Sequence, residues 1–193
     1  DLHPSEIIGI VGDMTDKDTV YVTDVGQHQM WAAQYLRHQK TKRFITSGGL
    51  GTMGFGYGAA IGASFGQPDC RIIHFTGDGS FHMNLNEACT AVSQKLPIIT
   101  IIMNNQVLGM VYQWQDVFYN GRHASTDPAR VTNFPALAEA FGAKGYSANT
   151  PDEFADAFAK ALKETDRPVW IDCHIAKDEF VLPMIPAGGT VED

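Results

Sequence analysis

Two apolar segments that end in polar residues constrain the fold of this chain more than any other feature. Residues 71–76 run into Gly77-Asp78-Gly79, residues 98–103 run into Asn104-Asn105, and a helix-sized segment separates the two. Two parallel strands joined by a crossover helix end at the same edge of a sheet. We therefore expect the Asp78 carboxylate and the Asn105 carboxamide to be neighbours at adjacent strand ends, where open α/β sheets bind ligands.

The residue types at these two strand ends indicate a metal and a phosphate. Asp78 and Asn105 offer oxygen ligands, and Mg²⁺ is usually held by one or two carboxylates together with phosphate oxygens. The glycines around Asp78 allow a sharp turn and the close approach of a phosphate. Residues 80–87 are expected to open a helix whose N-terminal N–H groups favour an anion. The alternative is that Gly-Asp-Gly is only a turn, but the helix-length spacer and the following Asn-Asn favour a ligand site.

The rest of the sequence alternates helix and strand patterns, which predicts an α/β fold with a parallel sheet and helices on both faces. Expected helices cover residues 4–14, 27–36, 56–66, 85–95, 110–119, 134–141 and 151–163, and expected strands cover 19–24, 43–46, 71–76, 98–103, 144–148 and 169–174. Thr150-Pro151-Asp152-Glu153 combines an N-cap, a first-turn Pro and a capping-box Glu. We expect one domain over residues 1–193, with 180–193 as an extended C-terminal tail.

Composition argues against several classes of protein. Hydrophobic residues make up 44% of the chain, which predicts a packed core, and the formal net charge is −8. This charge argues against nucleic-acid and membrane-surface partners. No apolar run approaches a membrane span, no signal peptide is visible, and the three widely spaced cysteines are typical of a reduced, intracellular protein. Because the chain starts without Met, we expect an excised domain or a processed product.

A second glycine-rich segment offers a competing hypothesis. Gly49-Leu-Gly51-Thr-Met-Gly54 fits the G-x-G-x-x-G pattern of nicotinamide-dinucleotide sites between a strand and a helix. That function needs an acidic residue at the end of the next strand. Asp69 has the right spacing but precedes the strand, and the acid at the strand end is Asp78 inside Gly-Asp-Gly. The dinucleotide interpretation is therefore the weaker one.

Several independent stretches resemble the acetohydroxyacid synthase (acetolactate synthase) family. They are residues 23–31, 48–54, 104–111, 113–115 and the tail segment 181–189. The Gly-Asp-Gly segment, its spacer and the Asn-Asn segment also resemble the metal-diphosphate motif of thiamine-diphosphate enzymes. The resemblance covers essentially the whole chain. It implies the C-terminal, thiamine-diphosphate-binding domain of a catalytic subunit that normally has three domains.

This resemblance implies roles for individual residues. The implied Mg²⁺ ligands are the side chains of Asp78 and Asn105 and the main-chain carbonyl of Val107. The implied cofactor-binding residues are Gln27 and His28 at the diphosphate, Gly51, Thr52 and Met53 at the pyrimidine side, Asp78, Gly79 and Ser80 at the metal and diphosphate, and the loop of Asn105, Gln106, Val107, Leu108, Gly109 and Met110. Met53 is expected to bend the cofactor, and Trp114 to cover the active-site entrance and select the second substrate.

The resemblance also implies an activity and partners. The family decarboxylates pyruvate and condenses the two-carbon unit with pyruvate or 2-ketobutyrate in branched-chain amino acid biosynthesis. The activating Glu and most FAD contacts belong to other domains of the subunit, so this chain alone is expected to be inactive. Expected partners are the N-terminal and middle domains, a second subunit in a homodimer or higher oligomer, and a regulatory small subunit. The expected location is the cytoplasm, or a plastid in a plant or alga. Another thiamine-diphosphate carboligase or decarboxylase is the alternative within the superfamily.

Overall fold

The six strands form a single parallel sheet. The computed structural model describes residues 1–37, 40–185 and 188–190. The strands are β1 (Val20–Thr23), β2 (Phe44–Ile45), β3 (Ile72–Gly77), β4 (Ile99–Asn104), β5 (Lys144–Ala148) and β6 (Val169–His174). Their order across the sheet is β2-β1-β3-β4-β6-β5, and every neighbouring pair is parallel. The α/β class predicted from the sequence is confirmed.

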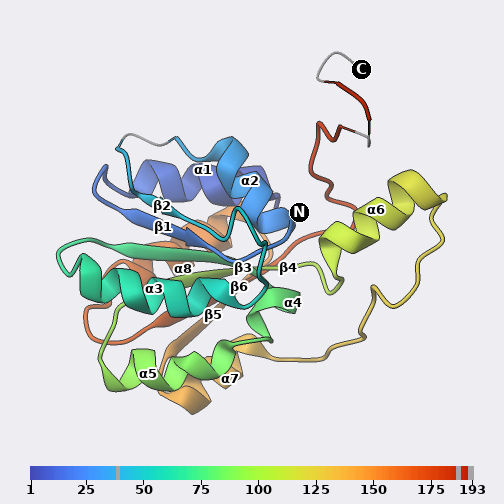
Figure 1. The fold of residues 1–193 in the computed structure, drawn as a ribbon. Helices are drawn as coiled ribbons and strands as arrows, with labels where there is room; N and C mark the ends of the chain where they lie inside the picture. The colour runs from blue at the N-terminus through green and yellow to red at the C-terminus, as the bar shows by residue number, and fades with distance from the viewer. Residues whose placement is uncertain (38–39, 186–187, 191–193) are drawn as a thin grey trace.

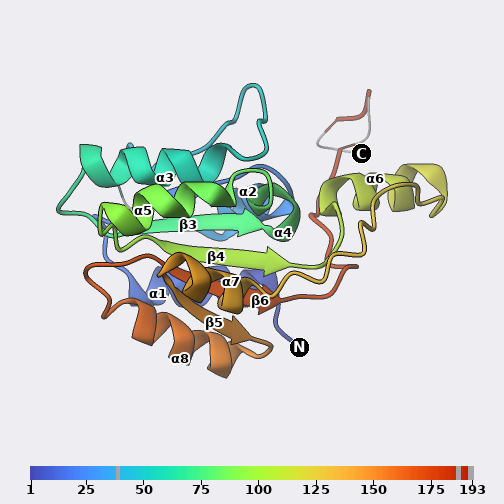
Figure 2. The ribbon, with the colours of Figure 1, turned by 90° about the horizontal axis from the view of Figure 1, so that it is seen from below.

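Helices cover both faces of this sheet (Figures 1 and 2). The helices are α1 (Pro4–Met14), α2 (Gln27–Tyr35), α3 (Phe55–Gly66), α4 (Asp78–Phe81), α5 (Ala88–Ser93), α6 (Gly109–Tyr119), α7 (Phe134–Phe141) and α8 (Pro151–Ala161). Buried residues of α1, α2 and α8 pack on one face, and those of α3, α5 and α7 pack on the other. Both views show α6 projecting beyond the carboxyl edge of the sheet.

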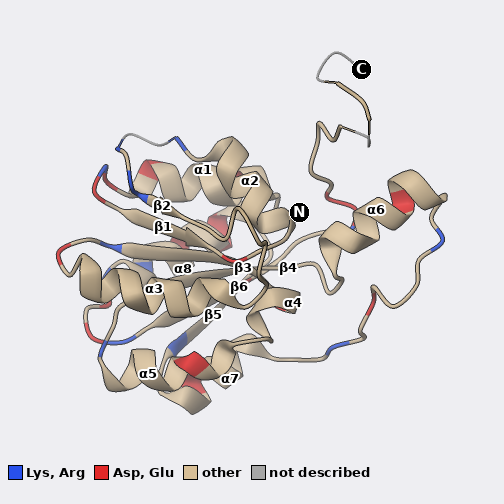
Figure 3. Cartoon of the chain, in the orientation of Figure 1, with Lys and Arg blue, Asp and Glu red and all other residues tan. Residues whose placement is uncertain are grey.

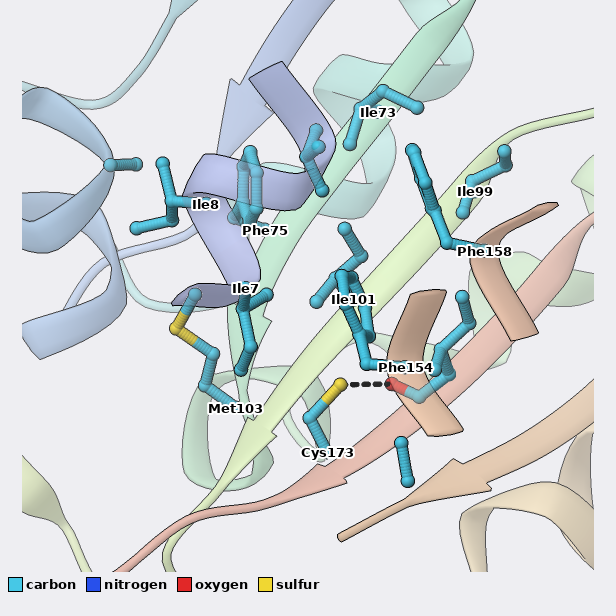
Figure 4. Packing of buried hydrophobic residues seen from close by; sticks show 14 of the residues in the cluster. Ile7, Ile8, Ile73, Phe75, Ile99, Ile101, Met103, Phe154, Phe158 and Cys173 are labelled. Carbon is cyan, nitrogen blue, oxygen red and sulfur yellow. Dashed lines mark hydrogen bonds between the residues drawn. The ribbon is translucent and has the colours of Figure 1, made fainter. Parts of the chain in front are cut away.

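Alternate residues of the central strands supply the two cores. In β4, Ile99, Ile101 and Met103 join the core under α1, α2 and α8, whereas Ile102 joins the opposite core. Figure 4 shows the first of these cores, where Ile101 lies among side chains of β3, α1 and α8. Burial on both faces explains why the strands read as continuous apolar runs. Figure 3 accordingly shows the charged residues mainly on loops and helices. No helix in the described part of the chain is long and apolar enough to cross a membrane.

The segment between β3 and β4 differs from the prediction. A helix was expected over residues 85–95, with its first turn opening at residues 80–87. Instead, α4 already begins at Asp78 and ends at Phe81, a 3-10 turn covers Leu85–Glu87, and α5 covers Ala88–Ser93. The break coincides with Asn84, whose φ is −147° and whose Nδ2 donates to the Gly54 carbonyl 3.2 Å away. A tertiary contact to the glycine-rich loop therefore takes the place of a continuous helix.

Candidate functional site

The sheet brings the two predicted ligand residues to the same edge. Gly77 of β3 pairs with Met103 of β4, so the residues that follow, Asp78 and Asn104-Asn105, leave the sheet side by side. Asp78 and Asn105 line one cavity of about 70 Å³ at this edge. The cavity is also lined by residues from the loop after β1, from α2, and from the start of α6. It includes Gln27, His28, Met53, Gly79, Ser80, Val107, Leu108, Gly109 and Met110.

The Asp78 carboxylate is buried beside a positive charge. Its side chain is only 4% exposed, and Oδ2 lies 3.5 Å from Arg130 Nη1. Burial raises the pKa of Asp78, and the nearby Arg130 guanidinium opposes that rise. The main-chain carbonyl of Asp78 lies 2.6 Å from His82 Nδ1. A desolvated carboxylate held in one position is a good cation ligand, because a bound cation would offset the cost of its burial.

Asn105 is held by a second carboxamide. Its Nδ2 donates to Gln27 Oε1 at 3.1 Å, and its Oδ1 accepts from the Val107 N–H at 3.3 Å. Gln27 Nε2 in turn donates to Gln113 Oε1 and to the Glu179 carbonyl, both at 2.9 Å. Asn105 Oδ1 therefore keeps one lone pair for a metal, while both Nε2 protons of Gln27 are already used.

Glycines allow very close packing around the cavity. A Cβ on Gly109 would lie 1.9 Å from Gln27 Oε1, and a Cβ on Gly77 would lie 2.9 Å from His28 Nδ1. Neither position can carry a side chain without displacing its neighbour. Glycine at these two positions therefore lets the Gln27 and His28 side chains pack directly against the main chain.

His28 contributes an unpaired nitrogen to the same place. The residue is 5% exposed, and Nε2 has no hydrogen-bond partner among the described residues. Burial lowers the pKa of His28 to about 3, so the ring is neutral near pH 7. An unsatisfied buried polar atom costs about 1–3 kcal/mol. A ligand that pairs with this nitrogen would recover that cost.

Comparison with known proteins identifies the kind of ligand. A family model described as "Thiamine pyrophosphate enzyme, C-terminal TPP binding domain" matches residues 24–173. The chain belongs to this family. Thiamine pyrophosphate, also called thiamine diphosphate, is therefore the cofactor of the fold, and the dinucleotide hypothesis is set aside.

The most similar proteins narrow the family further. The chain is 46% identical to the acetolactate synthase large subunit of Lactococcus lactis subsp. lactis, over 97% of this chain and 32% of that protein. It is 42% identical to acetolactate synthase 1, chloroplastic, of Nicotiana tabacum, over 100% of this chain and 30% of that protein. The resemblance seen in the sequence is thus confirmed. The chain spans about one third of the length of the curated relatives it matches.

A solved structure confirms the fold independently. The thiamine diphosphate-dependent 4-hydroxybenzoylformate decarboxylase of Rhodococcus jostii RHA1 superposes with a TM-score of 0.84 at 26% identity. The superposition covers 93% of this chain and 33% of that chain. The fold of this chain is therefore that of a thiamine-diphosphate-dependent enzyme.

The residues at the cavity fit a diphosphate and its metal. The unpaired, buried Nε2 of His28 suits a phosphate oxygen as its partner. The Asp78 carboxylate and the free Asn105 lone pair suit Mg²⁺, which prefers oxygen ligands. The roles assigned to these residues, including the Val107 carbonyl as a ligand, stay predictions.

Several predicted site residues lie outside the cavity lining. Gly51 and Thr52 belong to the loop between β2 and α3, and Gln106 lines a neighbouring cavity with Arg130 and Asp172. Trp114 lies on α6, is 51% exposed, and contacts Phe118 edge-on.

Ser80 lines the cavity, but its hydroxyl donates to the Val25 carbonyl at 2.7 Å and so secures the loop after β1.

Sequence reasoning missed Asp24, which anchors the glycine-rich loop. Asp24 is 1% exposed, and its carboxylate accepts from the N–H groups of Val25 at 2.8 Å, Gly54 at 2.8 Å and Gly56 at 3.3 Å. These bonds tie the loop that carries Met53 to the end of β1, and Met53 Cε lies 3.9 Å from a Cβ built on Gly79. The position of Asp24 at the end of an apolar strand was the sequence feature that could have indicated this role.

Proposed function

We propose that this chain is the C-terminal thiamine-diphosphate- and Mg²⁺-binding domain of an acetolactate synthase catalytic subunit. Such a subunit would decarboxylate pyruvate and condense the two-carbon unit with pyruvate or 2-ketobutyrate, in branched-chain amino acid biosynthesis. The observation that carries the proposal is the 38–46% identity, over 95% or more of the chain, to a series of proteins that are all named acetolactate synthase.

The chain's own residues would bind and orient the cofactor. When bound, thiamine diphosphate supplies a ring that stabilises the carbanion left after a 2-keto acid loses carbon dioxide. Asp78 and Asn105 would hold Mg²⁺, and the loop of residues 105–110 would wrap the diphosphate. The neutral His28 ring would offer Nε2 without adding a charge. Met53, which is 36% exposed beside Gly79, would support the bend of the cofactor.

The remaining parts of the site would come from elsewhere in the subunit. We propose that the activating Glu lies on an N-terminal domain of a second subunit in a homodimer or higher oligomer. FAD would bind mainly a middle domain, and a regulatory small subunit is a further partner of this assembly. The proposed location is the cytoplasm, or the plastid for a plant or algal protein.

The test is to produce the complete subunit and to measure acetolactate formed from pyruvate. We expect turnover that requires thiamine diphosphate and Mg²⁺. The rate is measured with and without FAD. Asp78→Ala should abolish turnover through loss of cofactor affinity, while circular dichroism shows a retained fold. Unchanged thiamine diphosphate binding by this variant would refute the assignment of the metal site.

A second candidate function is decarboxylation without condensation. It is favoured by the structural similarity to a protein named as a decarboxylase, at 26% identity. The product distinguishes the two functions, because a decarboxylase releases an aldehyde from the 2-keto acid, whereas a carboligase forms a new carbon–carbon bond. Acetaldehyde as the sole product from pyruvate would favour the decarboxylase.

A further inference from the structure

A row of three buried carboxamides connects the C-terminal segment to the candidate metal site. Gln113 of α6, Gln27 of α2 and Asn105 after β4 are 0%, 3% and 9% exposed. They are linked in that order by amide-to-amide hydrogen bonds of 2.9 and 3.1 Å. The chain after β6 passes the N-terminal end of α6 in both views (Figures 1 and 2). The row therefore joins parts of the chain that lie far apart in sequence.

The main chain of Val181 fixes which way the first amide points. Gln113 Nε2 donates to the Val181 carbonyl at 2.8 Å, and Gln113 Oε1 accepts from the Val181 N–H at 2.9 Å. A carbonyl can only accept and an N–H can only donate, so reversing the Gln113 amide would break both bonds. Oε1 must consequently face Val181 N–H, and this is also the atom that Gln27 meets.

This orientation is passed along the row. Because Gln27 meets an acceptor on Gln113 and another at the Glu179 carbonyl, its Nε2 must face them, and its Oε1 must face Asn105. Asn105 must then present Nδ2 to Gln27, which leaves Oδ1 on the opposite side, where it accepts from the Val107 N–H. The one oxygen of Asn105 is thereby kept available as a ligand.

We propose that Gln113 is a positioning residue for the metal site: its two hydrogen bonds to the Val181 main chain fix its own amide, and together with the Glu179 carbonyl it holds the amide orientation of Gln27 and so directs Asn105 Oδ1 toward Mg²⁺. This inference rests on the proposed metal role of Asn105. Partners outside the ligand shell typically change metal affinity by about 10–100-fold when they are removed. The segment of residues 179–181 is, on this view, part of the metal site although it contributes no ligand.

The decisive variants keep the size of residue 113 and change its hydrogen bonding. Gln113→Met removes both amide atoms, so the orientation of Gln27 rests on the Glu179 carbonyl alone and that of Asn105 on the Val107 N–H alone. Gln113→Glu keeps an acceptor for Gln27 and for the Val181 N–H, and in this fully buried position the acid is expected to be protonated, so that its O–H replaces Nε2 as the donor to the Val181 carbonyl. The matched control is Gln34→Met, because exposed Gln34 also donates to the tail main chain, at the Leu182 carbonyl 3.2 Å away, but lies outside the row.

The measurement is thiamine diphosphate binding by calorimetry in the complete subunit, titrated with MgCl₂. We expect the half-saturating Mg²⁺ concentration to rise about tenfold or more in Gln113→Met, to lie within about threefold of the unaltered value in Gln113→Glu, and to be unchanged in Gln34→Met. Hydrogen exchange of the peptide containing Val181, in cofactor-free protein, should be faster in Gln113→Met.

The possible results separate this inference from the proposed function. If MgCl₂ does not affect thiamine diphosphate binding by the unaltered protein, the metal site itself is wrong. If binding depends on Mg²⁺ and Gln113→Met leaves that dependence unchanged, the positioning role is refuted. Equal weakening in Gln113→Met and Gln113→Glu also refutes it, because packing of the tail would then be the cause. Should Gln113→Met fail to fold, the comparison of Gln113→Glu with Gln34→Met still decides, since a loss confined to Gln113→Glu contradicts the proposal.

Discussion

Asp78 Oδ2 lies 3.5 Å from Arg130 Nη1, and this ion pair joins the end of β3 to the loop between α6 and α7. The carboxylate is almost fully buried, whereas 26% of the Arg130 side chain is exposed. The guanidinium therefore contacts the same carboxylate that we assign to Mg²⁺. Two cations that share one carboxylate compete for it, so the loop and the metal site are coupled.

The first prediction concerns this competition. Arg130→Gln should lower the half-saturating Mg²⁺ concentration for thiamine diphosphate binding by about two- to fivefold, which corresponds to the roughly 0.5–1 kcal/mol of a partly exposed ion pair. Arg122→Gln is the control, since Arg122 belongs to the same loop but donates to the Tyr119 carbonyl. An increase in the half-saturating Mg²⁺ concentration in Arg130→Gln would instead mean that Arg130 itself binds the diphosphate.

A second prediction concerns stability without cofactor. Burial raises the pKa of Asp78 above its ordinary value of 3.8, so ionisation of this group disfavours the folded state. The cost is absent below 3.8, where both states are protonated, and is complete above the raised folded pKa. Asp78→Asn should therefore raise the melting temperature of cofactor-free protein at pH 7 by about 2–4 °C, as about 1 kcal/mol does for a domain of this size.

The pH dependence checks the cause of that stabilisation. The gain in Asp78→Asn should shrink as the pH falls toward 3.8, and differential scanning calorimetry at several pH values measures it. Asp156→Asn, at the exposed ion pair with Lys160 on α8, is the control. A destabilised Asp78→Asn at pH 7 would show that the Arg130 pair outweighs the burial of the carboxylate.

The strands, and the residues that follow the carboxyl ends of β3 and β4, could be predicted because the apolar runs that indicate them are local in sequence. Strands buried on both faces need continuous apolar residues, and parallel pairing then brings Asp78 and Asn105 to one edge. The helix expected at residues 85–95 is present as the 3-10 turn Leu85–Glu87 and α5, but the break before it at Asn84 was not predicted, because the bond from Asn84 to the Gly54 carbonyl joins segments that lie 30 residues apart. Nothing in the local sequence around Asn84 indicates that contact.

The carboxamide row was beyond prediction for the same reason. Gln27 was expected at the diphosphate, but its side-chain protons bind Gln113 and Glu179, which follow it by 86 and 152 residues. A glutamine on a predicted helix is most often a solvated surface residue, so Gln113 carried no signal by itself. The contact of Arg130 with Asp78 could not be predicted either, because a long loop has no periodicity from which to place its side chains.

A third prediction concerns acid stability and His74. This residue lies on β3 at 0% exposure, stacks on Tyr57, and has an unpaired Nε2 among the described residues. Burial lowers the pKa of His74 to about 3 from 6.5, as it does for His28. The folded state disfavours protonation of these rings. Their contribution to the free energy of unfolding is therefore complete above pH 6.5 and is lost as the pH falls toward 3.

Removing one of the two buried rings should reduce that loss. In His74→Leu, the slope of the unfolding free energy against pH between 6.5 and 3 should fall by up to about 1.4 kcal/mol per pH unit, the value for one proton. Urea denaturation at a series of pH values measures the slope. His74→Gln, also uncharged, should behave alike. A slope that changes in only one of the two variants would point to packing against Gly56 rather than to titration.

The last prediction is that residues 1–193, produced alone, fold but do not form acetolactate. The two cores cover both faces of the sheet, so a stable domain is expected without further segments. The proposed activating Glu is supplied by another domain, and loss of a general acid–base group alone typically costs about 10²–10⁴ in rate. Met53, which lines the cavity, is 36% exposed, and a partner domain would have to cover it. We therefore expect weak thiamine diphosphate binding and turnover at background, with the complete subunit assayed in parallel as the control. Turnover by residues 1–193 at a rate near that of the complete subunit would show that the catalytic groups lie within this chain.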